Sequence, residues 1–351
     1  MKNFPLLLYD RHTGKRLKYL AIALIICLTI GWWQMIYVPG KSYKGELPPL
    51  TKQETILANE LKTHVTMLAE TIGERNFVAY SNLVKSANYL KSSFRELGYK
   101  VQEQNYQIDG NLYQNLSVEI PGSKTPEEII VIGGHYDSVN GSPGANDNAT
   151  GSAAVLALAK IFKNTIPEKT LRFVLFVNEE PPFFWTENMG SFVYAKRSQE
   201  LGEKIIGMIS LETVGYYSTA KGSQKYPTPL NLLYPSIGDF IGFVGNIPSK
   251  NFLDRAIASF RQHTQYPSEG VAAPNLLPGI GWSDHWAFWQ HGFPAIMLTD
   301  TAPYCYPYYH TPEDTPDKVD YDRTARVIWG VSQVIRELAG INSKDSPPTM
   351  P

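Results

Sequence analysis

The chain contains very little cysteine. Its 351 residues include only two, Cys27 and Cys305. This pair, far apart in the sequence, gives neither a disulfide framework nor a site at which several thiolates bind a metal. Any metal ion must therefore be bound by histidine and carboxylate side chains.

The chain also lacks an excess of charge of either sign. Its formal net charge is -1, its pI is about 6.7, and no long run of like charges occurs. A protein that binds nucleic acid normally has a basic face and a high pI, so we expect no nucleic-acid partner. With 43% hydrophobic residues the chain can bury a large core, as an ordinary globular protein does.

One segment, residues 19–38, has no charged side chain at all. About 20 helical residues at ~1.5 Å each cover the ~30 Å hydrocarbon thickness of a bilayer. The segment therefore predicts a transmembrane helix. A cleaved signal peptide is the alternative, but its apolar region would span ~7–15 residues and end at small residues. This segment ends in tryptophan and isoleucine, which favours an uncleaved anchor.

The flanks of this segment predict its orientation. Lys15, Arg16 and Lys18 directly precede it, and aromatic residues gather near its far end, as at a membrane interface. We expect a single-pass membrane protein whose N-terminus is cytoplasmic and whose catalytic domain is extracytoplasmic. The predicted organisation is a cytoplasmic segment (1–18), the anchor (19–38), a linker (39–50), one folded domain (51–341) and a disordered tail (342–351).

The hydrophobic pattern of the folded domain changes along the chain. Helical spacing is followed by strand alternation and then by short, almost continuous apolar runs, which are typical of strands covered on both faces. A helical segment between two such runs predicts a parallel crossover. We expect an α/β fold with a mixed, mostly parallel central sheet and helices on both faces. The predicted helices are 51–72, 81–97 (capped by Ser81), 149–163 and 317–339; the predicted strands are 101–108, 112–120, 129–134, 171–177, 205–211 and 295–298.

Histidine and carboxylate residues occur where these strands end. In open α/β sheets, ligands bind outside the carboxyl ends of the strands. Each residue alone has an ordinary explanation as a helix cap, a solvated strand end or a loop residue. Their joint occurrence at one edge of a sheet indicates a metal site. The residues are His135, Glu179 and Glu180, and Glu212 after successive strands, Asp147 at the start of a helix, and His310 in a later loop.

The chemistry of a two-metal site accounts for these residue types. Two zinc ions ~3.5–4 Å apart need a carboxylate between them, and Asp147 is suitably placed to bridge them. One of the adjacent Glu179 and Glu180 can bind a metal while the other remains free as a general base. Asp137, two residues after His135, can accept the ring N–H that faces away from the metal.

On these residues the sequence resembles the co-catalytic zinc exopeptidases of the aminopeptidase Y and bacterial leucyl aminopeptidase type, peptidase family M28. The resemblance covers approximately residues 51–341. It rests on six segments: GGHYDS (His135, Asp137), GANDNATGSAA (Asp147), NEE (Glu179, Glu180), SLETVGY (Glu212), SDHWAF (Asp284, His285) and YYHTPEDT (His310).

The resemblance implies a role for each matched residue. It implies two zinc ions bridged by Asp147, one completed by His135 and Glu212 and the other by Glu180 and His310. It further implies that Glu179 is the general base, that Tyr309 hydrogen-bonds the developing oxyanion, and that the Asp147–Asn148 peptide is cis. It also implies that Asp137, Asp284 and His285 lie around the ligands and support them. The implied activity is hydrolysis of peptides with a free N-terminus.

Two departures from the family pattern bear on these expectations. The position of Glu212 is often aspartate in relatives, and residues 181–189 form an aromatic segment where many relatives have a short glycine-rich turn. The segment either lines a pocket for an apolar side chain or packs its loop on the sheet.

Three other functions stay open at this point. They are a glutaminyl cyclase with one zinc, a carboxypeptidase of the same family, and an inactive peptidase fold that serves as a binding protein. A carboxypeptidase would need a basic residue for the substrate carboxylate, and no arginine stands out for it. An inactive relative would have lost ligands, whereas every ligand position is filled here. The sequence does not indicate the oligomeric state.

Overall fold

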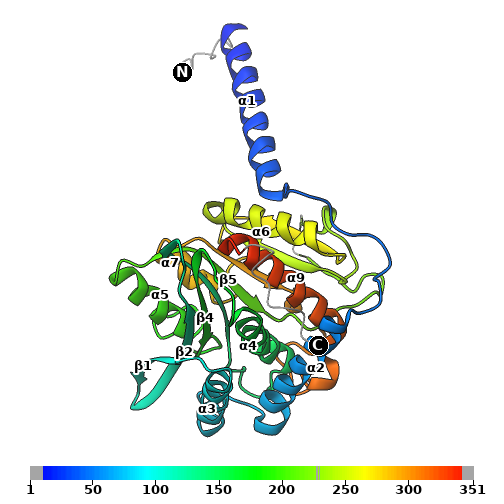
Figure 1. Ribbon diagram of the computed structural model, residues 1–351. Coiled ribbons are helices and arrows are strands. Elements are labelled where there is room, and N and C mark those ends of the chain that lie inside the picture. Colours follow the sequence, from blue (N-terminus) through cyan, green and yellow to red (C-terminus); the bar gives the residue numbers. More distant parts are fainter. Residues whose placement is uncertain (1–10, 227, 229, 342–351) are drawn as a thin grey trace, which may run out of the picture. The chain divides into compact units, whose positions relative to one another are not determined.

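The computed structural model describes residues 11–226, 228 and 230–341, and the chain divides into two units, with the boundary after Tyr37. The second unit contains one eight-stranded sheet with the strand order β1-β2-β4-β3-β5-β8-β6-β7 (Figure 1). The strands are β1 (Gln102–Ile108), β2 (Asn111–Ile120), β3 (Thr125–His135), β4 (Lys169–Phe176), β5 (Lys204–Glu212), β6 (Ile241–Gly245), β7 (Ser268–Ala272) and β8 (Ala295–Thr299).

The first unit holds a single long helix, α1 (Arg11–Ile36). Its segment 14–36 is long and apolar enough to cross a membrane. The helix covers most of the predicted anchor and extends toward the N-terminus by several residues. The first ten residues of the predicted cytoplasmic segment and the predicted disordered tail (342–351) lie outside the described residues.

The middle of the sheet is parallel, as the sequence predicts. β3 lies between β4 and β5 and pairs parallel with both, and β5 pairs parallel with β8. β2 and β6 flank this group with antiparallel pairing. The almost continuous apolar runs of β3 and β4 are buried because helices cover both faces of these strands.

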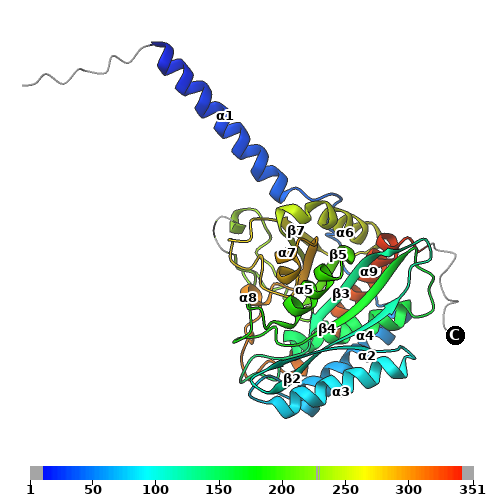
Figure 2. The same cartoon turned by 90° about the vertical axis from the view of Figure 1, so that its left-hand side faces the viewer.

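Helices cover the sheet in two layers (Figures 1 and 2). The larger layer shares one core with the sheet, and α9 packs against α2 and α6 within it. The smaller layer packs α5 and α7 around Tyr194 and Phe288 on the other face. The predicted α/β fold is therefore confirmed. The larger layer contains α2 (Lys52–Thr66), α3 (Tyr80–Glu96), α4 (Gly151–Phe162), α6 (Lys250–His263) and α9 (Tyr321–Ala339); the smaller contains α5 (Gly190–Glu200) and α7 (His285–Gln290).

The starts of two predicted helices were wrong. Ser81 does not cap α3, which begins at Tyr80; the side-chain oxygen of Asn76 instead accepts the backbone N–H groups of residues 78 and 79. The last helix begins at Tyr321 and not at 317, because a short 3₁₀ turn starts at Pro316 and Asp320 caps the helix. The first predicted helix ends in a π-helical turn, Met67–Ile72.

Candidate metal centre

The predicted site residues converge at the carboxyl ends of the parallel strands. His135 is the last residue of β3 and Glu212 is the last residue of β5. Glu179 and Glu180 lie in the loop that follows β4, and His310 lies in the loop that follows a short helix, α8 (Ala302–Cys305). Asp147 lies in the turn Ala145–Thr150 directly before α4, and its backbone angles and those of Asn148 are not helical. The sheet edge thus collects residues that are as much as 175 positions apart.

One group of side chains surrounds the Nε2 atom of His135. This atom lies 3.2 Å from a carboxylate oxygen of Glu212 and 3.4 Å from Oδ1 of Asp147. All three side chains offer an atom within 4.8 Å of the others, a spacing that can hold a metal ion. Glu179 stands beside this group, with its Oε2 atom 3.8 Å from the same histidine nitrogen.

A second group surrounds the Nε2 atom of His310. Its distances are 3.0 Å to Oδ2 of Asp147 and 3.5 Å to Oε2 of Glu180. Asp147 therefore belongs to both groups and directs one carboxylate oxygen toward each histidine. A carboxylate with this orientation is suited to bridge two metal ions. The division of the remaining ligands agrees with the one that the sequence resemblance implies.

The unpaired polar atoms of the site fit the binding of metal ions. The Nε2 atom of His135 and the Oε1 atom of Glu180 are buried and have no hydrogen-bond partner among the described residues. Buried polar groups are normally paired, so these atoms are suited to a cation. Nitrogen and carboxylate oxygen ligands with no thiolate are a donor set that zinc accepts.

The charges of the site lead to the same conclusion. Burial raises the pKa of Glu179 and of Glu180, and the neighbouring carboxylates raise it further. Burial also disfavours ionisation of Asp147, but His135 and His310 outweigh it and lower the pKa of this group. Several buried acidic groups in one place are stable together only with protons or cations between them.

Asp137 connects the first histidine to the glutamate pair. Its carboxylate lies 3.4 Å from Nδ1 of His135. The same carboxylate accepts the backbone N–H groups of Glu179 and Glu180, each at 3.1 Å. It therefore holds the loop after β4 against the end of β3 and fixes the position of three site residues.

Contact with a ligand near α7 comes from Ser283 and not from the two residues predicted there. Ser283 donates a hydrogen bond of 2.8 Å to Oε2 of Glu212. His285 instead contacts the carbonyl oxygen of Ile280 through Nε2 and packs against Trp289. Asp284 is buried without a hydrogen-bond partner among the described residues, and burial raises its pKa to about 7.

Arg75 and Asp314 hold the loops of the site and were not found from the sequence. Arg75 is buried, and its guanidinium donates to the backbone carbonyls of residues 136, 143 and 144, on either side of the loop that follows His135. Asp314 accepts the backbone N–H groups of Asn146 and Asp147. The Asp147–Asn148 peptide is cis, as the resemblance implies. No local pattern around Arg75 separates it from a surface arginine.

A pocket opens beside the first group of ligands. It has an empty volume of about 800 Å³ including its open mouth, and Glu212 and Tyr309 form one end of its lining. The ring of Tyr309 stacks on that of His310 with 3.8 Å between centroids. The aromatic segment 181–189 contributes no lining residue: Trp185 stacks on Trp286, and Phe183 packs against Tyr113. Of the two interpretations of this segment, the structure supports packing.

Comparison with known proteins identifies the family. The model of peptidase family M28 matches residues 115–335, which is more than half of the chain. The chain belongs to peptidase family M28. It is 39% identical over 281 residues to YfbL, an uncharacterized protein of Escherichia coli (strain K12), with 78% of this chain and 85% of that protein covered.

Other relatives are named for an activity. The chain is 24% identical to aminopeptidase YwaD of Bacillus subtilis over 76% of this chain, and it spans 53% of the length of that protein. Among solved structures, an aminopeptidase from Aneurinibacillus sp. strain AM-1 has a TM-score of 0.62 at 18% identity, covering 84% of this chain and 96% of that one. A zinc aminopeptidase from Bacillus subtilis has the same fold, with a TM-score of 0.64 at 17% identity. This M28 protein is therefore a zinc metallopeptidase with the fold of zinc aminopeptidases.

Proposed function

We propose that this chain is a membrane-anchored aminopeptidase that uses two zinc ions to hydrolyse the first peptide bond of peptides with a free N-terminus. The observation that carries this proposal is the position of Asp147, with one carboxylate oxygen toward each of the two histidine-containing groups. His135 and Glu212 would complete the coordination of one ion, and Glu180 and His310 that of the other. The aminopeptidase relatives support the direction of cleavage.

The chain's own residues supply the proton transfers of the reaction. These ligands would hold zinc ions, which would supply a lowered pKa for bound water and a Lewis acid for the scissile carbonyl. Glu179 belongs to neither ligand group and stands within 3.8 Å of the His135 nitrogen. It accepts the proton of the attacking water and delivers it to the leaving amine.

Tyr309 completes the proposed machinery. Burial raises the pKa of its hydroxyl well above the usual value, so the group stays protonated and can donate a hydrogen bond at neutral pH. Its ring is held against His310 beside the pocket. Hydrogen bonding to the oxygen of the scissile carbonyl stabilises the charge that develops there.

The alternatives are less well supported by the same side chains. A cyclase with one zinc gives no reason for a second histidine-containing group around Asp147. A carboxypeptidase needs a cation for the substrate carboxylate, but no lysine or arginine occurs among the described residues that line the pocket. The guanidinium of Arg75 is occupied by backbone carbonyls. An inactive scaffold leaves the complete ligand set without a purpose.

The membrane part of the proposal rests on α1. Its apolar length suits a bilayer, and the basic residues before it favour a cytoplasmic N-terminus. The peptidase domain would then act outside the cytoplasm, where free peptides with an unblocked N-terminus are its substrates.

The activity is tested with full-length protein purified in detergent and supplied with zinc. We expect release of nitroaniline from aminoacyl-nitroanilides and no release from the same compounds acetylated at the amine. Peptides that begin with glutamine are assayed in parallel for cyclisation. Cleavage of the acetylated compounds, or cyclisation without hydrolysis, would overturn the proposed function.

A further inference from the structure

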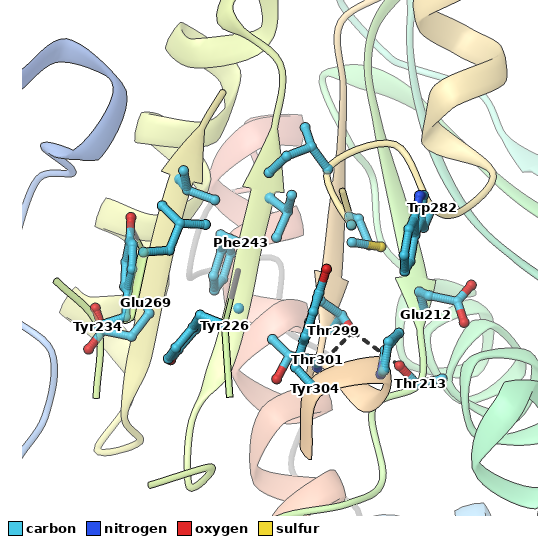
Figure 3. Close-up of a pocket in the computed structure, with 18 of the residues that line it drawn as sticks. Glu212, Thr213, Tyr226, Tyr234, Phe243, Glu269, Trp282, Thr299, Thr301 and Tyr304 are labelled. Carbon is cyan, nitrogen blue, oxygen red and sulfur yellow. Dashed lines mark hydrogen bonds between the residues drawn. The ribbon is translucent and has the colours of Figure 1, made fainter. Parts of the chain in front are cut away.

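The pocket beside the metal centre has a second acidic residue at the end opposite Glu212. Glu269 lies on β7, the edge strand, and lines the same pocket as Glu212 (Figure 3). Side chains alternate between the two faces of β7, and the residues on either side of Glu269 face helix α6. Ser268 contacts Arg261 of α6, and a side chain at Gly270 would meet Ile257 of the same helix. Glu269 therefore faces the pocket side of the sheet.

The sheet register sets the length of the pocket floor. Glu212 pairs with Thr299, Thr299 with Gly242, and Gly242 with Glu269. Paired residues point to the same face, and neighbouring strands lie about 4.8 Å apart, so the backbone positions of the two glutamates are about 14 Å apart across this row. The residues between them are a glycine and a threonine. The floor is therefore low, and a long slot runs from the metal ligand toward Glu269.

The walls of this slot are mostly apolar. Val244 pairs with Met297 and with Val271 in the neighbouring row of the floor. Tyr226, Tyr234 and Trp282 stand around it (Figure 3). The hydroxyls of both tyrosines donate to backbone carbonyls, so neither is directed to Glu269 as a hydrogen-bond donor. A flexible methylene chain fits such walls.

Glu269 has no partner of its own among the described residues. It forms no ion pair within 4.0 Å and no hydrogen bond there, although Arg261 and Lys44 are close enough to favour its ionised form. The guanidinium of Arg261 donates to the carbonyls of Pro39, Gly40 and Ser268. Burial raises the pKa of Glu269, which is the expected effect on a carboxylate that has lost water without gaining a full counter-charge.

We propose that this pocket selects peptides whose N-terminal residue is lysine or arginine, with Glu269 binding the side-chain cation. This inference rests on the proposed aminopeptidase function. The amine and scissile carbonyl of the peptide would lie at the metal centre, the methylene stem along the apolar walls, and the cation at the far end. A charge-assisted hydrogen bond in a partly dry pocket favours the cationic side chain over an apolar one of equal length.

The test compares lysine with norleucine, which has a stem of the same length without the ammonium group. For the full-length zinc-loaded enzyme we expect kcat/KM for lysyl-nitroanilide to exceed that for norleucyl-nitroanilide by about tenfold or more. Glu269→Gln keeps the shape of the side chain and removes its charge. This variant should lose the lysine advantage, and its kcat/KM for lysyl-nitroanilide should fall by about tenfold or more relative to that for norleucyl-nitroanilide.

A binding measurement separates recognition from catalysis. Lysinol and norleucinol have the amine and the side chain but no bond to hydrolyse. We expect Glu269→Gln to weaken the affinity for lysinol by about tenfold and to leave that for norleucinol unchanged. The matched control is Glu127→Gln, an exposed glutamate at the start of β3, which should alter neither value.

The outcomes distinguish this inference from the proposed function. If the wild-type enzyme cleaves norleucyl-nitroanilide and Glu269→Gln changes nothing for lysine, the inference is wrong and the aminopeptidase function stands. If the wild-type enzyme cleaves no aminoacyl-nitroanilide, the proposed function fails. A preference for apolar residues that is equal in wild type and variant would likewise overturn the inference.

Discussion

Asp147 and Glu179 differ in how they stand toward the two histidines. Asp147 contacts both histidine nitrogens, whereas Glu179 approaches only His135, at 3.8 Å. A carboxylate that bridges two cations is a weak base because both positive charges stabilise its ionised form, while one that stands beside them can still accept a proton. This difference separates metal binding from acid–base work within a cluster of similar side chains.

Substituting Glu179 should therefore affect turnover and not metal content. Glu179→Gln removes the basic oxygen and keeps the shape, so we expect kcat to fall by about 10²–10⁴-fold. Zinc content, measured by mass spectrometry of the purified protein, should equal that of the wild type. A variant that keeps its zinc and the wild-type rate would show that another group accepts the proton.

Ser283 should matter for metal affinity because it orients Glu212. Ser283→Ala removes the 2.8 Å hydrogen bond to this ligand. Loss of such a partner typically weakens metal binding by about 10–100-fold. Competition with a zinc chelator measures the change. His285→Ala, two residues away, is the comparison: it has no contact with a ligand among those described, and an equal loss of affinity there would argue against the role of Ser283.

Candidate metal ligands can be predicted from the sequence more readily than the residues that hold them in place. The candidate ligands could be chosen because metal chemistry restricts the residue types and the strand ends restrict their positions, and the structure brings them together: His135, Asp147, Glu180, Glu212 and His310. A supporting residue needs only a hydrogen bond in the right direction, which serine, arginine or a backbone group can provide. Ser283 and Arg75 were missed for this reason, since their contacts depend on loops that only the folded chain brings together.

At the scale of elements, α4 is held close to β5 at the point where the ligands begin. Gly151, the first residue of α4, lies against the carbonyl oxygen of Leu211, and a side chain there would overlap this oxygen and the side chain of Asn148. Asn148 bridges the same elements by donating to Leu211 and accepting the N–H of Thr213. The spacing of helix and strand thus sets the distance between Asp147 and Glu212.

We expect Gly151→Ala to disturb both stability and metal binding. Overpacking of this kind costs about 1–3 kcal/mol, and the shift of α4 should weaken zinc affinity as well. The control is Thr51→Ala, which removes the capping box of α2, distant from the site in sequence. It should lower the free energy of unfolding by about 0.5–2 kcal/mol without changing zinc affinity. Equal zinc affinity in wild type and Gly151→Ala would contradict this account of α4.

The elements that the sequence predicts best are long or strongly apolar. β3 and β4 were predicted because their runs are buried on both faces, and α2 because of its spacing. β6 and β7 have only five residues each and contain glycines, so the apolar run of β6 is interrupted and β7 shows no clear alternation. These short strands carry the pocket floor and Glu269, which explains why the sequence analysis named residues for a candidate metal centre and none for the pocket.

At the scale of the whole molecule, α1 is expected to place the peptidase domain outside the cytoplasm. A phosphatase that is active only in an oxidising compartment, fused after residue 50, should be active in bacterial cells. The same fusion after residue 14 should be inactive, because it lacks the apolar helix. Reversed activities would contradict the predicted orientation, and a full-length protein that stays soluble after cell fractionation would contradict the anchor.

The most direct test of the account is the number of zinc ions per chain. Counted by native mass spectrometry on the zinc-loaded protein, wild type should hold two ions. His310→Ala should hold one, because the group formed by His135, Asp147 and Glu212 remains intact. Asp147→Ala, which removes the shared ligand, should retain neither ion stably. A wild-type chain that binds a single zinc ion, unchanged by His310→Ala, would contradict the two-metal centre on which the proposed function depends.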